Sequence, residues 1–166
     1  MKSAFSVKLV LRISAVLFSL GLLGMSWAAS PALQWAKRVG GALDDWGMHV
    51  AALQDGGCYV TGFNKATATF GAGEADQTSL TVVDKQLMFL ARYRADGTLA
   101  WVKGASGSSN VMMLGLSVTP MPDDGAVVSG MLIGGTATFG KGEAHETLLS
   151  ASGTESAFLA RYQANG

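Results

Sequence analysis

Hydrophobic and polar residues alternate with a period of two in several short segments after residue 33. In FLARY (Phe89–Tyr93), the first, third and fifth side chains fall on one face of an extended strand, and the second and fourth fall on the other. CYVTGF (Cys58–Phe63) and AVVSGM (Ala126–Met131) are rich in β-branched and aromatic residues, and both follow an Asp-Gly turn signal. No segment after residue 30 has a helical period. The pattern predicts an all-β fold of short strands.

Further strands are predicted from runs with the same alternation. GMHVAAL (Gly47–Leu53) aligns with GLSVTPM (Gly115–Met121), which places Met48 and Val50 on one face that we expect to be buried. One more strand is predicted in each half of the chain, LQWAKRV (Leu33–Val39) and LAWVKG (Leu99–Gly104).

The predicted strands recur along the chain at a nearly constant spacing. The matched pairs are LQWAK and LAWVK at an offset of 66 residues, DGGCYVTG and DDGAVVSG at 68, TATFGAGE and TATFGKGE at 69, and FLARYRADG and FLARYQANG at 69. The chain therefore uses one unit of four or five short strands twice. Insertions fall between the matched pairs, where loops tolerate changes of length. The predicted loops are Arg38–Trp46, Ala75–Gln86, Ser106–Met113 and Ala144–Thr154.

Many short strands at a long fixed period are typical of a β-propeller, in which each repeat forms one blade. The motif order also resembles the SBBP β-propeller repeats, with a tryptophan strand, a DG turn, an ATFG segment and an F-L-A-R-Y strand. The resemblance covers residues 33–166 and implies one blade per repeat in an exported or cell-surface bacterial protein, without catalytic residues. The residues that carry it are Trp35, Gly62, Phe70, Gly71, Phe89, Tyr93 and Gly97 in the first copy, and Trp101, Gly130, Phe139, Gly140, Phe158, Tyr162 and Gly166 in the second.

Two repeats fall short of a closed propeller, which usually has about four to eight blades. The expected organisation is a signal peptide at 1–28, a first repeat at 29–98 and a second repeat at 99–166. The predicted fold is an incomplete propeller of two blades, each with four to five short antiparallel strands. Because the last motif ends in register at Gly166, we expect a truncated array or a fragment. Two blades leave faces uncovered, so we expect further blades or a homo-oligomer to complete the propeller.

The first thirty residues have the composition of a secretory signal. Lys2, Lys8 and Arg12 precede an uncharged run rich in leucine, valine and small residues. Small residues at its end suit a signal peptidase, so we expect a signal helix and cleavage near Ala28. The apolar run is shorter than the ~20 residues of a membrane span, and a retained anchor is the alternative. We expect a secreted, periplasmic or cell-surface protein with no membrane span after cleavage.

Charge and cysteine content exclude some classes of partner and bond. Removing residues 1–28 takes away three basic side chains and no acidic one, which leaves nine basic against twelve acidic side chains and a formal charge of −3. This balance offers no electrostatic footprint for nucleic acid or for an anionic membrane. Cys58 is the only cysteine, so an intrachain disulfide is impossible, and its alignment with Ala126 predicts a small packed residue.

The two glycine-spaced motifs allow two interpretations. A phosphate loop needs a glycine-rich turn between a strand and a helix, so that backbone N–H groups meet the anion. No helix signal follows Gly71 or Gly140, and the carboxylates of Glu74 and Glu143 would repel an anion. The motifs therefore predict structural turns in preference to a phosphate cradle.

Candidate contact residues lie just before the strand predicted at 47–53. The paired carboxylates of Asp44 and Asp45 suit a hard metal ion, but their counterparts in the second copy are methionines, which favours a solvated loop. Trp46 is expected in the same loop and has Leu114 as its counterpart. It is our candidate for contact with a glycan or a peptide, with Asp44 and Asp45 beside it.

Catalytic machinery is not predicted. His49 and His145 are the only histidines, their surroundings differ, and His49 falls on the face opposite to Val50, which predicts an exposed side chain. No serine lies in a nucleophile-elbow pattern, so no Ser-His-Asp arrangement is indicated. The recurring tryptophans and phenylalanines are expected to pack between blades. We therefore predict no catalytic residue, no cofactor and no metal site.

The sequence predicts an exported, non-catalytic repeat protein that serves as a structural or binding module at the bacterial surface or in the periplasm. Its partner would be a protein or glycan bound through the loops that differ between the copies. The alternative is a fragment of a propeller-fold enzyme, a metal-assisted hydrolase or lyase, since fold alone implies neither role. Carboxylates or histidines repeated at inward-facing positions would favour the enzyme, and the sequence has none. A non-functional remnant of a longer gene is a third possibility.

Overall fold

Ten β-strands joined by turns make up the described part of the chain, residues 30–108 and 110–166 of the computed structural model. The strands are β1 (Trp46–Ala52), β2 (Cys58–Phe70), β3 (Thr78–Tyr93), β4 (Leu99–Gly104), β5 (Ser106–Gly107), β6 (Met112–Pro120), β7 (Ala126–Ile133), β8 (Thr136–Phe139), β9 (Thr147–Ser150) and β10 (Glu155–Tyr162). The described residues contain no helix, so the predicted all-β class is confirmed. None of them belongs to a helix that is long and apolar enough to cross a membrane. The predicted signal peptide and signal helix, residues 1–28, lie outside the described residues.

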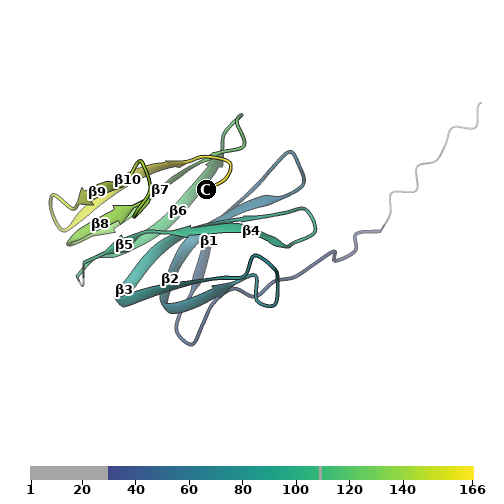
Figure 1. The fold of residues 1–166 in the computed structure, drawn as a ribbon, viewed down its shortest axis with the longest axis horizontal. Helices are drawn as coiled ribbons and strands as arrows, with labels where there is room; N and C mark the ends of the chain where they lie inside the picture. The colour runs from purple at the N-terminus through teal and green to yellow at the C-terminus, as the bar shows by residue number, and fades with distance from the viewer. Residues whose placement is uncertain (1–29, 109) are drawn as a thin grey trace, which may run out of the picture. The chain divides into compact units, whose positions relative to one another are not determined.

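The strands form three open antiparallel sheets (Figure 1). The first sheet has the strand order β1-β2-β3-β4, the second β10-β7-β6 and the third β5-β8-β9. Residues 33–166 belong to one structural unit, which contains both sequence repeats.

Repeat 1 (29–98) and repeat 2 (99–166) build the same arrangement of strands. β1 corresponds to β6, β2 corresponds to β7 and β8 together, and β3 corresponds to β9 and β10. Both first strands carry a β-bulge at the same place, after Gly47 in β1 and after Gly115 in β6. The tryptophan strand of repeat 2, β4, pairs with β3 and so completes the sheet of repeat 1.

A bend interrupts the long hairpin of each repeat at the same position. Ala66 in β2 has a positive φ of 51°, beside a bulge in the pairing with β3. Its counterpart Gly135 has a φ of 61°, and the preceding Gly134 has a φ of 59°. Glycine adopts this left-handed conformation without the steric cost that other residues meet. Two consecutive left-handed glycines separate β7 from β8, whereas the single left-handed residue Ala66 leaves β2 continuous.

Several local predictions are wrong. Residues 33–39 form no strand, although Gly40 makes one bridge with Thr69. The matching segment Leu99–Gly104 is the strand β4 because it pairs with β3, and no described strand pairs with residues 33–39. Trp46 is the first residue of β1 and not a loop residue. Three of the predicted loops also contain strand residues, from the start of β3, from β5 and from β9.

Each repeat has two faces, which we name after its FLARY strand. The Phe face of repeat 1 carries Phe89, Ala91 and Tyr93, and its Leu face carries Leu90 and Arg92. The predicted alternation is confirmed, because the three Phe-face side chains belong to one buried cluster and Leu90 belongs to another. In repeat 2 the equivalent Phe-face residue is Phe158 and the equivalent Leu-face residue is Leu159.

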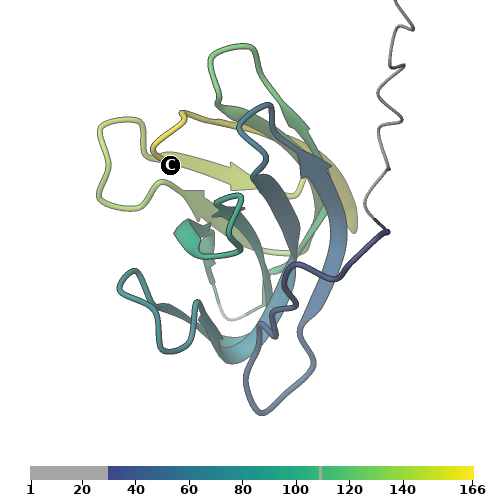
Figure 2. The same cartoon turned by 90° about the vertical axis from the view of Figure 1, so that its right-hand side faces the viewer.

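The Phe face of repeat 2 packs on the Leu face of repeat 1. β6 contacts β1, β2 and β3, and lies next to β1 in the ribbon (Figures 1 and 2). Tyr59, Met88 and Leu90 from repeat 1 share one core with Val118 and Val128 from repeat 2. The largest core of the described chain is therefore the contact between the two repeats.

The buried face predicted for the first strand of each unit is confirmed only at Val118 of repeat 2, because Leu116 on the same predicted face is exposed. Val118 is buried in the core between the repeats, but its counterpart Val50 is exposed. Met48 is exposed as well, because it is the extra residue of the β-bulge. The matching valine is thus covered in one copy and uncovered in the other.

Candidate functional site

The Asp-Gly turns of both repeats are held by the same polar contacts. Asp55 accepts a hydrogen bond from the backbone N–H of Gly57 at 2.8 Å and forms an ion pair with Arg92 at 3.0 Å. These contacts, the backbone hydrogen bond first, lower the pKa of Asp55 below its usual value. The second copy repeats both contacts, with Asp123, Gly125 and Arg161 at 3.3 Å and 2.6 Å.

The TATFG motifs form tight turns that end in a glutamate. Gly71 and Gly73 have φ values of 62° and 80°, and their counterparts have nearly the same values, 58° and 80°. Glu74 binds Lys37 at 2.7 Å through one carboxylate oxygen and the backbone N–H of Leu99 at 2.6 Å through the other. The hydrogen bond from Lys37 is the main cause that lowers the pKa of Glu74. In repeat 2 the matching ion pair joins Glu143 and Lys103 at 2.6 Å.

This geometry makes the glycine motifs turns between strands. Neither motif leads into a helix, since the following described residues enter β3 and β9. The carboxylate of Glu74 accepts hydrogen bonds from Lys37 and Leu99, and its negative charge at the turn would repel a phosphate. The glycines serve the positive φ angles of the turn.

The tryptophan segments fasten each repeat to its last turn. The indole N–H of Trp35 donates to the carbonyl of Ala95 at 3.0 Å, and that of Trp101 donates to the carbonyl of Ala164 at 2.9 Å. The turn glycine Gly97 has a φ of 80°, and a Cβ there would lie 2.7 Å from the Trp35 ring. The recurring aromatic residues are therefore packing residues, as predicted. The phenylalanine rings pair within each repeat, and Phe139 and Phe158 also belong to the core between the repeats.

The three predicted contact residues do lie together, at the start of β1. Asp44 forms an ion pair with Lys65 at 3.0 Å. Asp45 accepts hydrogen bonds from the backbone N–H groups of Gly41, at 2.7 Å, and of Lys65, at 3.1 Å. Trp46 stacks on a neighbouring phenylalanine ring at 6.1 Å and remains largely exposed. The two carboxylates hold the loop before β1, which leaves Trp46 as the side chain free to contact a ligand.

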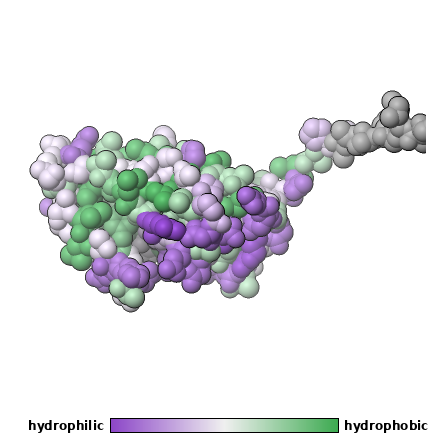
Figure 3. All heavy atoms as spheres, turned by 90° about the horizontal axis from the view of Figure 1, so that it is seen from above, coloured by the Kyte–Doolittle hydropathy of each residue, from purple (hydrophilic) through white to green (hydrophobic). Residues whose placement is uncertain are grey.

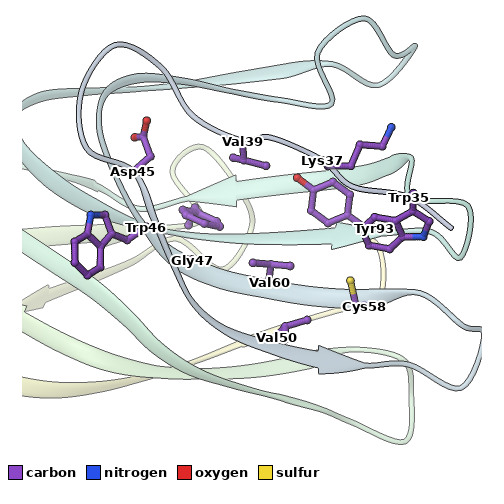
Figure 4. Close-up of a pocket in the computed structure, with 11 residues that line it drawn as sticks. Trp35, Lys37, Val39, Asp45, Trp46, Gly47, Val50, Cys58, Val60 and Tyr93 are labelled. Carbon is purple, nitrogen blue, oxygen red and sulfur yellow. The ribbon is translucent and has the colours of Figure 1, made fainter. Parts of the chain in front are cut away.

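An apolar groove on the Phe face of repeat 1 is lined in part by Asp45 and Trp46. Its volume is about 250 Å³. Figure 4 shows Trp46 at one end of the groove and Trp35 and Tyr93 at the other, with Val60 and Cys58 between them. The volume lies below the roughly 300–1,000 Å³ of typical small-molecule pockets. The groove therefore suits the side chains of another protein segment better than an enclosed small molecule.

Two tyrosines at matching positions have buried hydroxyl groups. Tyr93 and Tyr162 are the last residues of the two FLARY segments, and neither hydroxyl has a hydrogen-bond partner in the described part of the chain. Burial raises the pKa of each phenol to about 12. Tyr93 borders the apolar groove, so its hydroxyl is a polar group that a bound segment could satisfy.

The remaining candidate side chains offer little chemistry. Among the described residues, no group of three or more histidine, cysteine, aspartate or glutamate side chains is placed to hold a metal ion. His49 is exposed, and its Nδ1 accepts a hydrogen bond from the backbone N–H of Val118 at 3.3 Å. Burial raises the pKa of the Cys58 thiol, which disfavours the reactive thiolate.

Several contacts were missed from the sequence, although the signal for them is present. Lysine occurs two residues after both tryptophans, and glutamate ends both glycine motifs. Each lysine pairs with the glutamate of its own repeat. Charged residues that recur in step with a repeat can therefore be read as partners. The groove itself could not be found from the sequence, because it exists only where no other described repeat packs against the Phe face of repeat 1.

Comparisons with protein-family models, with curated proteins and with solved structures give no match for this chain.

Proposed function

We propose that the chain is an exported, non-catalytic repeat module of the β-propeller type, which binds a protein or glycan or builds structure at a bacterial surface or in the periplasm. The main support for the proposal is that the charged residues that recur between the copies form ion pairs within the fold. They hold turns and segments of the fold, in the pairs Asp55–Arg92, Asp123–Arg161, Lys37–Glu74 and Lys103–Glu143. Groups committed to such ion pairs are poor candidates for acid–base or metal chemistry.

The first sheet supports the propeller part of this proposal. Its four antiparallel strands follow one another in chain order, β1-β2-β3-β4, and strands in the four-stranded blade of a propeller are also antiparallel. Repeat 2 supplies the fourth strand, and its own β6, β7 and β10 form a sheet in the equivalent order. The SBBP-like order of motifs and the signal-like residues 1–28 support a blade identity and export.

The binding part of the proposal centres on Trp46 and the apolar groove. An exposed aromatic ring beside an apolar groove provides a contact surface for a protein segment or for the face of a sugar ring. Asp44 and Asp45 lie beside the ring and would border the bound partner. Trp46→Ala is expected to remove binding without changing the fold, because the ring is largely exposed.

The test against the alternative is a search for turnover. The chain would be assayed with esterase, glycosidase and phosphatase substrates in the presence of added divalent metal ions, and we expect no activity above background. Turnover that depends on a metal ion and is abolished by Asp44→Ala would overturn the proposal in favour of a metal-assisted hydrolase or lyase. Asp123→Ala is the matched control, because Asp123 holds a turn in repeat 2, away from the candidate residues.

A further inference from the structure

The contact between the two repeats uses one face and one strand edge of each, and the complementary surfaces remain uncovered. Repeat 1 offers its Leu face and the outer edge of β3, which repeat 2 covers. Repeat 2 offers the same Leu face and the outer edge of β10, and no described element covers either. Repeat 1 likewise has an exposed part of its Phe face, at Val50 beside the apolar groove, and a tryptophan segment, residues 33–39, that pairs with no described strand.

The strand edges match in sequence as well as in position. β3 pairs with β4 through FLARY and LAWVK, with Arg92 opposite Trp101 and Tyr93 opposite Leu99. β10 ends in the same FLARY letters, and residues 33–37 read LQWAK. An exposed strand edge is a template for another strand. The pairing seen between β3 and β4 therefore predicts how residues 33–39 of a second copy would pair with β10.

A cavity in repeat 2 corresponds to a position in repeat 1 that a leucine side chain fills. In repeat 1 the position beside Gly71 is filled by the fully buried Leu99 of repeat 2, whose backbone N–H donates to Glu74. The equivalent place in repeat 2 is a cavity of about 400 Å³, bordered by Gly140 and Glu143. The residue that corresponds to Leu99 is Leu33, which is 84% exposed.

The Phe face of repeat 1 and the Leu face of repeat 2 each have an exposed side chain whose counterpart is buried where the repeats meet. Leu90 is 0% exposed under repeat 2, and its counterpart Leu159 is 74% exposed. Val118 is 2% exposed against repeat 1, and its counterpart Val50 is 62% exposed. Figure 3 shows hydrophobic residues gathered on the surface of the molecule beside a band of hydrophilic residues. Apolar side chains exposed together in this way mark an interaction surface.

A glycine and a carbonyl oxygen show the same correspondence. A Cβ on Gly115 would overlap the hydroxyl of Thr61, so the close approach of the repeats requires glycine there, whereas a Cβ on the matching Gly47 would lie 3.7 Å from its nearest neighbour. The carbonyl of Ala164 accepts hydrogen bonds from Trp101 of its own repeat and from Arg92 of the neighbouring repeat, at 2.9 Å and 3.0 Å.

We propose that copies of this chain associate head to tail, with residues 33–39 of one copy added as a strand to β10 of the next. The Phe face of repeat 1 in the first copy packs on the Leu face of repeat 2 in the second. Leu33 of the first copy fills the cavity beside Glu143 of the second, and Trp35 of the first copy lies opposite Arg161 of the second. This deepens the proposed function, because it names a second copy as the partner of the module.

The interface is heterologous, so each copy uses two different surfaces and the assembly forms a ring or an open chain. It is expected to be weaker than the contact between the repeats. Tyr59 donates to the carbonyl of Asp124 across the repeats at 2.6 Å, and the corresponding residue in repeat 2 is Val127, which has no hydroxyl. Arg161 retains the donor that Arg92 provides.

The test measures the mass of the full chain, in the form that expressing cells process, by sedimentation velocity over a micromolar concentration series. The wild-type chain is expected to associate as its concentration rises. Leu33→Asp and Leu159→Asp should each weaken association at least about tenfold, because each places a charge in an apolar part of the proposed interface. Both side chains are largely exposed within one copy, so circular dichroism should remain unchanged. Leu148→Asp is the matched control, since Leu148 is exposed and its counterpart Ser79 is also exposed.

Mixing the variants separates a head-to-tail contact from a symmetric one. Leu33→Asp keeps an intact β10 end, and Leu159→Asp keeps an intact tryptophan segment, so the mixture should form a one-to-one dimer. Gly47→Ala should also weaken association, because its methyl group would meet the next copy where Gly115 meets Thr61. A folded wild-type monomer at all concentrations, or a mixture without the dimer, would overturn the proposal and leave these surfaces to a different partner. Neither result depends on the turnover assay, so failure here leaves the non-catalytic function standing.

Discussion

Repeat 1 and repeat 2 have the same strands, turns and polar contacts, but they differ in which face is covered. Val118 in repeat 2 is buried and its counterpart Val50 in repeat 1 is exposed, while Leu90 in repeat 1 is buried and Leu159 in repeat 2 is exposed. The residue types at the matching positions are identical. Burial in this chain is therefore decided by the neighbouring repeat and not by the local sequence.

The comparison also separates two kinds of interaction. Contacts within a repeat, such as the Asp-Gly turn and the tryptophan hydrogen bond, occur in both copies with similar distances. Contacts between repeats occur once. A repeat unit thus brings its own turns, and it needs a neighbour to bury its apolar faces.

The largest difference is expected between the two leucines of the FLARY strands. Leu90→Ala should lower the free energy of unfolding by about 2–5 kcal/mol, because it leaves a cavity in the core between the repeats. Leu159→Ala should change the same quantity by about 0.5 kcal/mol or less, since its side chain is mostly exposed. Urea denaturation of dilute protein measures both values. Equal costs for the two variants would show that the Leu face of repeat 2 is covered within one chain.

A smaller difference is expected between two glycines. Gly115→Ala should lower the free energy of unfolding by about 1–3 kcal/mol, because its methyl group would overlap Thr61 and force the repeats apart. Gly47→Ala should cost about 0.5 kcal/mol or less in the same denaturation experiment, because the nearest atom is at an ordinary contact distance of 3.7 Å. A cost for Gly47→Ala as large as that for Gly115→Ala would show that glycine serves the β-bulge in both strands and not the approach of the repeats.

Much of the fold could be predicted because the repeat supplies the same information twice. The strand in FLARY, its two faces and the turns at Gly71 and Gly140 follow from local alternation and from turn chemistry. The segment at 33–39 could not be predicted correctly, because the matching segment of repeat 2 forms a strand, β4, through pairing with β3. Whether such a segment forms a strand depends on its tertiary contacts, because its sequence allows pairing but does not specify the neighbouring strand.

The candidate site shows the same limit. The sequence favours a solvated loop over a metal site for Asp44 and Asp45 and makes them candidate contacts beside Trp46, and the structure pairs them with Lys65 of β2 and with Gly41 of the loop before β1. Trp46 was singled out because it departs from its counterpart, and it does border the apolar groove. The groove exists because the Phe face of repeat 1 has no described repeat against it, which is information about a neighbour and lies outside any local pattern.

The smallest expected difference concerns the aspartates of the two DG turns. Asp55 positions Arg92, which also donates a hydrogen bond to the carbonyl of Ala164 across the repeats at 3.0 Å. Asp123 positions Arg161, whose side chain makes one hydrogen bond in the described structure, to Asp123 itself. Asp55→Asn should therefore destabilise the fold more than Asp123→Asn does at neutral pH.

The pH dependence of that difference follows from the direction of the pKa shifts. The pKa values of Asp55 and Asp123 are both lowered in the folded chain, chiefly by the backbone hydrogen bonds of their turns, so the folded state binds these protons less tightly than the unfolded state. The stabilisation is complete above the unfolded pKa, near about 4, and is lost as the pH falls through the lower folded values. Chemical denaturation at a series of pH values should show each asparagine variant approaching the wild type in acid, with the larger gap closing for Asp55→Asn. If the difference in the free energy of unfolding between wild type and variant stayed unchanged in acid, the charge of the aspartate would not be its cause. The destabilisation would then come from the shape of the turn.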